Sequence, residues 1–257
     1  MKQLLKRLLA TLGYRVVRLD TGRSAPGEWP LEFSAEEASI VDRVLRGQLT
    51  MASKERLYAT VMACKHVIAQ RVAGDFVECG VWRGGNSLIA ADVFARAGAN
   101  RGIYLFDTFA GMTEPTAEDF RARDGRDAMI DYVAHQKGTH NEWCFASLAD
   151  VRNNFADLKL LSPSVRFVEG DVVQSLKIES NLPKSISVLR LDTDWYESTR
   201  AELEVLYPRL SPGGVLIIDD YGHWGGAKKA VDEYFRGRPK PLLQYTDYTG
   251  RMGVKPL

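Results

Sequence analysis

The sequence predicts a doubly wound, Rossmann-like α/β fold with a mostly parallel, seven-stranded sheet. Five short runs, apolar almost throughout, alternate with segments of helical periodicity. Strands that helices cover on both faces of a parallel sheet are apolar on both sides, and each is followed by a helix that crosses to the next strand. The alternation in the sequence therefore predicts this architecture. Two more short candidate strands flank the turn-like residues 247–250 near the C-terminus, so we expect the sheet to end in an antiparallel hairpin.

The composition is that of a globular protein. The chain has 257 residues, of which 45% are hydrophobic and 26% charged, and a formal net charge of +1. The chain therefore has no overall excess of positive charge of the kind that nucleic-acid-binding proteins have. Its three cysteines have no zinc-site spacing, so we expect a reducing, cytoplasmic environment. No apolar run approaches the roughly 20 residues that span a bilayer.

Residues 1–50 form the first predicted region, an amphipathic helix followed by a linker or lid. In residues 1–19 leucines repeat at helical spacing among lysines and arginines, which is compatible with peripheral contact with an anionic membrane. Packing of this helix on its own domain or on a partner subunit is the alternative. A stretch rich in Gly, Pro and Ser follows, and Ser34 and Glu37 then have the spacing of a helix N-cap and its capping-box acid.

Residues 51–257 form the second predicted region. Apolar side chains at three- and four-residue steps predict a helix over residues 53–71. The predicted strands follow in the order DFVECGV, IYLFD, VRFVEG, ISVLRLD, VLIID, LLQY and RMGVK. The connection at about residues 108–163 is longer than usual, and we expect an insertion there. It would serve as a lid or acceptor-binding element, or alternatively in oligomerisation.

A glycine-rich turn follows the first strand. Gly80, Gly84 and Gly85 let the backbone pass close to a ligand, and the next helix begins with unpaired N–H groups. The spacing is neither the G-x-G-x-x-G of dinucleotide binders nor that of a P-loop. The turn therefore predicts a nucleotide-like cofactor, with a merely structural tight turn as the alternative.

Acidic residues end the second and third strands. Asp107, at the end of IYLFD, has the position from which an acid accepts hydrogen bonds from both ribose hydroxyls. Asp171 follows VRFVEG and can approach the exocyclic amine or the ribose side of an adenosine. An acid that only caps a loop is the alternative for Asp171.

Four carboxylates follow the fourth and fifth strands, which we expect to be neighbours. They are Asp192 and Asp194 after one strand, and Asp219 and Asp220 after the other. Repulsion among them is costly without a cation. Oxygen ligands without a matching Cys or His cluster favour a hard ion such as Mg²⁺. Independent acids that cap the following helices are the alternative.

Several long motifs resemble the macrocin O-methyltransferase (TylF/MycF-like) family. They are VECGVWRGG, FDTFAGM, LRLDTDWYEST, GGVLIIDDYGHWGGAKKAVDEYF and DYTG. The resemblance extends from about Met51 to the C-terminus. It implies a class I methyltransferase fold, S-adenosylmethionine and Mg²⁺ as cofactors, and a sugar hydroxyl on a natural product as the acceptor.

The resemblance also implies roles for individual residues. Asp192, Asp219 and Asp220 would hold Mg²⁺, and Asp194 would be the general base. The residues expected at the S-adenosylmethionine site are Met51, Glu78, Gly80, Trp82, Ser87, Asp107, Asp171 and Asp192. His223 is a candidate acceptor contact or second base, and a packed or solvent-facing histidine is the alternative.

The expected activity is therefore methylation of a hydroxyl on a glycosylated natural product or a surface glycan, by a homo-oligomeric enzyme. A non-sugar small-molecule O-methyltransferase of the same fold is the first alternative. A strand ending in D-x-D also opens the site of haloacid-dehalogenase-type phosphatases, but there it normally stands on the first strand, and here three strands precede it. A non-catalytic nucleotide-binding module would leave the four acids without a purpose.

Overall fold

The computed structural model describes residues 29–257, and the helix predicted within residues 1–19 lies outside them. The chain divides into two compact units, Met1–Ala38 and Ser39–Leu257. The first contains the predicted capping box. The Glu37 N–H donates to Ser34 Oγ at 3.2 Å, and the Ser34 N–H donates to Glu37 Oε2 at 2.7 Å. This box opens helix α2 (Ala35–Arg46).

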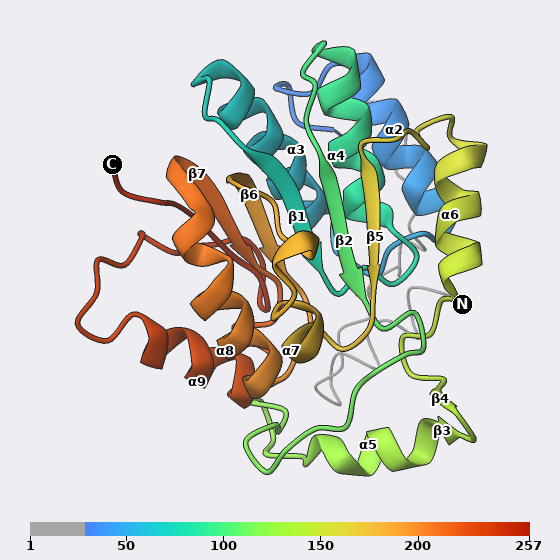
Figure 1. The fold of residues 1–257 in the computed structure, drawn as a ribbon, viewed down its shortest axis with the longest axis vertical. Coiled ribbons are helices and arrows are strands. Elements are labelled where there is room, and N and C mark those ends of the chain that lie inside the picture. Colours follow the sequence, from blue (N-terminus) through green and yellow to red (C-terminus); the bar gives the residue numbers. More distant parts are fainter. Residues whose placement is uncertain (1–28) are drawn as a thin grey trace, which may run out of the picture. The chain divides into compact units, whose positions relative to one another are not determined.

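A seven-stranded sheet forms the centre of the second unit and confirms the predicted fold class (Figure 1). Its spatial order is β5-β2-β1-β6-β7-β9-β8. The first five strands pair in parallel, whereas β9 pairs antiparallel with both β7 and β8. The strands are β1 (Asp75–Cys79), β2 (Ile103–Asp107), β5 (Val165–Glu169), β6 (Ile186–Leu191), β7 (Leu210–Ile218), β8 (Gln244–Tyr245) and β9 (Arg251–Val254). The strand order reverses between β1 and β6, and ligands bind at the carboxyl ends of strands at such a switch point.

Helices cover both faces of this sheet, which explains why its central strands are apolar (Figure 1). One face carries α3 (Lys54–Ala69) and α4 (Gly85–Arg96), and the other carries α7 (Val172–Ser175), α8 (Tyr196–Val205) and α9 (Gly225–Tyr234). All six residues of β6 are buried. Arg190 is the one charged residue among them, and it requires paired anions nearby.

The connection between β2 and β5 contains α5 (Ala128–His135), the hairpin β3 (Gln136–Lys137) and β4 (His140–Asn141), and α6 (Leu148–Asp157). Figure 1 shows α5 beyond the carboxyl ends of the parallel strands. Hydrogen bonds attach this insertion to the start of α8. The Trp195 indole donates to the Thr113 carbonyl at 2.9 Å, and the Tyr196 N–H donates to Asp119 at 2.8 Å.

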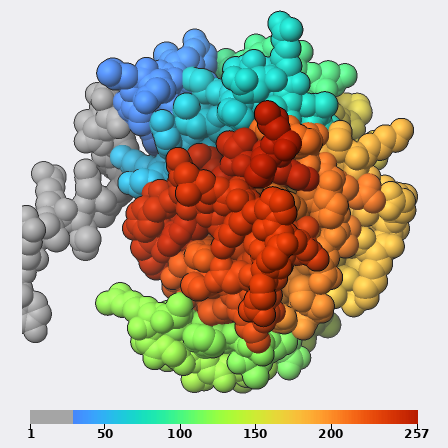
Figure 2. Space-filling model, turned by 90° about the vertical axis from the view of Figure 1, so that its left-hand side faces the viewer, coloured from blue at the N-terminus to red at the C-terminus, as the bar shows by residue number. Residues whose placement is uncertain are grey.

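The C-terminal hairpin has the predicted antiparallel form. Between β8 and β9, Asp247 accepts hydrogen bonds from the backbone N–H groups of Thr249 and Gly250 at 3.0 and 2.7 Å. Figure 2 shows this C-terminal segment in red, with the insertion in green below it. Among residues 29–257, no helix is long and apolar enough to cross a membrane.

Candidate active site

A cavity of about 420 Å³ opens at the carboxyl ends of the central strands, where the strand order reverses. It brings together residues from all the motifs singled out in the sequence. The predicted site residues that line it are Met51, Glu78, Gly80, Trp82, Asp107, Asp171, Asp192, Asp194, Asp219, Asp220 and His223. Ser87 lies behind this lining, where its hydroxyl donates to Glu78 Oε2.

Glu78 is a buried carboxylate on β1 with two fixed partners. Ser87 donates to one of its oxygens, and Arg190 donates to the other at 2.9 Å. Burial raises the pKa of Glu78 to about 7, and the positive charge of Arg190 opposes that rise. The carboxylate is thereby oriented at the cavity wall, where it can accept a hydrogen bond from an amino group.

Asp107 is tied to the glycine-rich turn. Its Oδ2 accepts hydrogen bonds from the N–H groups of Val81 and Trp82 at 2.6 and 3.0 Å, and its Oδ1 accepts from Phe109 at 2.8 Å. Burial raises its pKa, and these backbone donors oppose the rise. The contacts fix the direction of the carboxylate, and its remaining lone pairs are available to a ligand that carries hydroxyl groups.

Gly80 has a structural role, which is the alternative that the sequence left open for the glycine-rich turn. Its φ is +78°, and a Cβ at this position would lie 1.9 Å from the carbonyl oxygen of Asp192. The backbone of the segment that follows β6 therefore requires a glycine at this position. The turn therefore holds the carboxyl ends of β1 and β6 in close contact.

Asp171 combines the two interpretations that the sequence left open. Its side chain accepts the Val173 N–H at 2.9 Å and caps α7, and the residue also lines the cavity. A capping role and a ligand-facing position thus coexist at this residue.

Three of the four clustered acids meet closely. Asp192, Asp194 and Asp220 each offer an oxygen, and these oxygens all lie within 4.8 Å of one another. Asp220 Oδ2 is buried and has no hydrogen-bond partner. Withdrawal from solvent raises the pKa values of Asp192 and Asp220 well above the usual range, and neighbouring carboxylates add to the rise. An orphaned oxygen in an all-oxygen donor set fits a hard divalent cation.

Asp194 differs from its neighbours in conformation. Its φ is +69°, which is uncommon for a residue with a side chain. Burial raises its pKa to about 7, while hydrogen bonds with Asp220 and the Trp224 side chain favour the ionised form. A carboxylate with this pKa can take up a proton near neutral pH.

Asp219 lies outside the group of three and is held by two arginines. Arg190 donates to its Oδ1, and Arg56 donates to its Oδ2. Arg190 is 1% exposed and also pairs with Glu78 and Asp192. Sequence reasoning missed both arginines, although a charged residue inside the apolar run ISVLRLD was a visible signal for Arg190.

Glu202 is a further buried acid beside the site. It lies on α8 with no exposed surface and accepts the hydroxyl of Thr193 at 2.8 Å. Burial raises its pKa to about 8. Because Thr193 stands between Asp192 and Asp194, this bond fixes the loop that carries both acids.

Aromatic side chains form a wall on the insertion side of the cavity, where Trp143 and Trp224 line it and Trp195 packs behind them. The ring centroids of Trp143, Trp195 and Trp224 lie 5.0 to 5.9 Å apart in edge-to-face pairs. His223 packs edge-on against Trp224, and its Nδ1 lies 2.8 Å from the Tyr248 hydroxyl. Burial and then the charge of Arg121 lower the pKa of His223. This histidine therefore lines the cavity as an uncharged hydrogen-bonding group at neutral pH.

Residues 32–250 match the family model described as macrocin-O-methyltransferase (TylF). The chain belongs to the macrocin O-methyltransferase family. The 8-demethyl-8-(2,3-dimethoxy-alpha-L-rhamnosyl)-tetracenomycin-C 4'-O-methyltransferase of Streptomyces olivaceus is 36% identical over 239 residues, which cover 91% of this chain and 84% of that protein. The demethyldecarbamoylnovobiocin O-methyltransferase of Streptomyces niveus is 36% identical over 189 residues, covering 72% and 67%.

Among solved structures, the O-methyltransferase NovP superposes with a TM-score of 0.70 at 32% identity, covering 81% of this chain and 82% of that one. The macrocin O-methyltransferase assignment confirms the resemblance seen in the sequence and makes the protein a methyltransferase. It replaces the phosphatase and the non-catalytic alternatives. The D-x-D motif follows β6, the fourth strand of the large sheet in chain order. In the phosphatases the motif follows the first strand.

Proposed function

We propose that this macrocin O-methyltransferase transfers a methyl group from S-adenosylmethionine to a sugar hydroxyl, on a glycosylated natural product or a surface glycan, with the help of Mg²⁺ or another hard divalent cation. The observation that carries the proposal is the meeting of Asp192, Asp194 and Asp220 within one cavity, with an orphaned oxygen on Asp220. The relatives support a sugar acceptor, since two are named for methylation of a rhamnosyl group and of mycinamicin III.

The donor side of the cavity lies around β1 and β2. Glu78 would accept a hydrogen bond from the amino group of S-adenosylmethionine, and Asp107 would accept from the ribose hydroxyls. Asp171 and Trp82 line the same side and would contact the adenosine portion. The segment at Met51 would lie near the amino-acid end of the cofactor.

The cation would be held by Asp192, Asp219 and Asp220. Asp192 and Asp220 already present oxygens to a common point, whereas Asp219 would have to share an oxygen with an arginine. A hard divalent cation held there lowers the pKa of an adjacent hydroxyl group.

Asp194 would act as the general base. As the hydroxyl oxygen bonds to the methyl carbon, the carbon–sulfur bond breaks, sulfur keeps the electron pair, and the hydroxyl proton passes to Asp194. The Trp224 side chain beside this carboxylate lowers its pKa and so favours the ionised form that takes up the proton. The aromatic wall, with Trp143 and Trp224, would pack against the apolar face of the sugar, and His223 would hydrogen-bond one of its hydroxyl groups.

A methyl-transfer assay tests the proposal. Protein, methyl-labelled S-adenosylmethionine and Mg²⁺ are incubated with paired acceptors, each as the glycoside and as its aglycone, and products are identified by mass spectrometry. We expect transfer to the glycosides alone, and its loss in the Asp192→Asn and Asp194→Asn variants. Asp157→Asn, which changes an exposed acid on α6, is the matched control. Transfer to aglycones would favour a non-sugar acceptor, and full activity after chelation of divalent ions would refute the role of the cation.

A further inference from the structure

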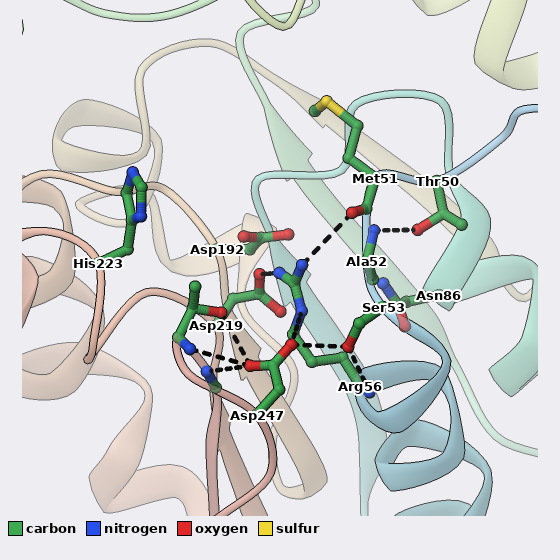
Figure 3. A network of polar contacts seen from close by, with 12 residues as sticks. Thr50, Met51, Ala52, Ser53, Arg56, Asn86, Asp192, Asp219, His223 and Asp247 are labelled. Carbon is green, nitrogen blue, oxygen red and sulfur yellow. Dashed lines mark hydrogen bonds and ion pairs between the residues drawn. The ribbon is translucent and has the colours of Figure 1, made fainter. Parts of the chain in front are cut away.

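Arg56 lies where three segments of the chain meet (Figure 3). Its side chain is only 16% exposed. Its Nη1 donates to Asp219 Oδ2, its Nη2 donates to the Met51 carbonyl oxygen at 3.3 Å, and its Nε lies 3.0 Å from Asp247 Oδ2. One guanidinium group therefore joins the residues before α3, the end of β7 and the turn of the C-terminal hairpin.

The first of these segments, residues 49–53, lines the proposed donor side of the cavity with its first four residues, and we call it the strap. It packs tightly on the glycine-rich turn, because a Cβ on Gly85 would lie 2.6 Å from the Leu49 carbonyl oxygen. At its other end, Ser53 donates to Asp247 Oδ2 at 2.6 Å. Arg56 and Asp247 together hold the end of the strap that carries Met51.

The second contact of Arg56 concerns the proposed cation site. Both oxygens of Asp219 accept hydrogen bonds, one from Arg190 and one from Arg56. Arg190 is completely enclosed and is also paired with Glu78, so it has no room to withdraw. Arg56 retains partial exposure. A cation that approaches Asp219 thus meets the positive charge of Arg56 and competes with it for the same oxygen.

We propose that Arg56 is a positioning residue that holds the strap in place for the methyl donor and, through the same guanidinium group, competes with the divalent cation for Asp219. The inference rests on the proposed function. It requires opposite effects on the two ligands: loss of the guanidinium group weakens donor binding and strengthens cation binding. A residue that only stabilised this part of the fold would weaken both when removed.

The test measures binding rather than turnover. S-adenosylhomocysteine affinity is determined by calorimetry, and Mn²⁺ affinity by electron paramagnetic resonance with Mn²⁺ as the sole metal. For Arg56→Gln we expect S-adenosylhomocysteine to bind about tenfold more weakly and Mn²⁺ about tenfold more tightly, the size of effect expected for a charged hydrogen bond and for one like charge in a part-buried cluster. Urea unfolding establishes that the variant is folded.

Two further variants separate charge from shape. Arg56→Lys keeps the positive charge but cannot reach Met51, Asp219 and Asp247 together, so we expect weaker S-adenosylhomocysteine binding with Mn²⁺ affinity close to wild type. Arg96→Gln removes an arginine from the Arg96–Asp92 pair on α4 and should leave both affinities unchanged.

The outcomes distinguish the inference from the proposed function. Weaker binding of both ligands by Arg56→Gln, or no change in either, overturns the inference while the cation site stands. A different result would refute the cation site itself: the wild type binds S-adenosylhomocysteine, but it binds Mn²⁺ no more tightly than Asp192→Asn does. The proposed competition at Asp219 would then be refuted as well.

Discussion

Replacement of Glu202 by Gln should change how the stability of the protein depends on pH. Glu202 is fully buried, and burial raises its pKa from an ordinary 4.5 to about 8. Below pH 4.5 both the folded and the unfolded chain carry the proton, so this group contributes nothing to the pH dependence. Between pH 4.5 and about 8 the unfolded chain loses the proton while the folded chain keeps it. The free energy of unfolding therefore falls as pH rises through this interval.

The size of the effect follows from this interval. Each pH unit lowers the free energy of unfolding by about 1.4 kcal/mol, so the whole interval corresponds to about 5 kcal/mol at most. The amide of Glu202→Gln does not titrate, and its oxygen can still accept the Thr193 hydroxyl. Between about pH 5 and pH 8 we expect the stability difference to move by about 2 to 4 kcal/mol in favour of the variant.

Urea unfolding, followed by circular dichroism across this pH range, measures the difference directly. The matched control is Glu204→Gln, because Glu204 is an exposed acid on the same helix. Its stability curve should run parallel to that of wild type. A Glu202→Gln curve that also stays parallel to wild type would show that Glu202 is ionised in the folded chain, and the argument from burial would be wrong.

Three other substitutions test separate parts of the structure. Gly80→Ala should lower the free energy of unfolding by about 2 to 4 kcal/mol, because its Cβ would overlap the Asp192 carbonyl oxygen. The control is Gly98→Ala, where φ is also positive but the space is open, and it should lower the free energy of unfolding by about 1 kcal/mol in the same urea titration. Equal losses in the two variants would contradict the close approach at Gly80. Asp194→Asn should lower kcat by about 10²- to 10⁴-fold with S-adenosylhomocysteine affinity retained, and a small kcat effect in steady-state kinetics would exclude it as the base. Trp195→Phe removes the indole donor to the insertion, so the KM for the acceptor should rise several-fold while the KM for the donor stays constant; a rise in both would argue against separate sides of the cavity.

Local patterns in the sequence were sufficient for the sheet and for the acids at its edge. The five parallel strands contain short, mostly apolar runs, and the clustered acids follow two of these runs directly, so their meeting needs only the parallel topology. The capping box at Ser34 is equally local. These features depend on residues that are close together in the chain or on a rule for strand ends.

The partners of the acids could not be predicted in the same way. Arg56 meets Asp219 across 163 positions of sequence, and Ser53 meets Asp247 across 194. No periodicity marks such pairs, because they arise only when α3 and the last hairpin pack beside the same strands. The aromatic wall is similar, since its tryptophans come from the insertion and from the starts of α8 and α9.

The attachment of the insertion has a consequence for engineering. The residues before α6 are tied to the first residues of α8 and α9 by the bonds from Trp195 and Tyr196 and by the backbone pairing of Arg121 with Trp224. Helix α6 is tied instead to the glycine-rich turn, where the Asn154 side chain donates to the Arg83 carbonyl at 3.0 Å. The acids of the reaction centre lie on the preceding loops, and none of them is a partner in these bonds. The part of the insertion before α6 is therefore a replaceable module. A chimera that exchanges this part and its docking residues for those of a relative should acquire a new acceptor preference without rebuilding the reaction centre.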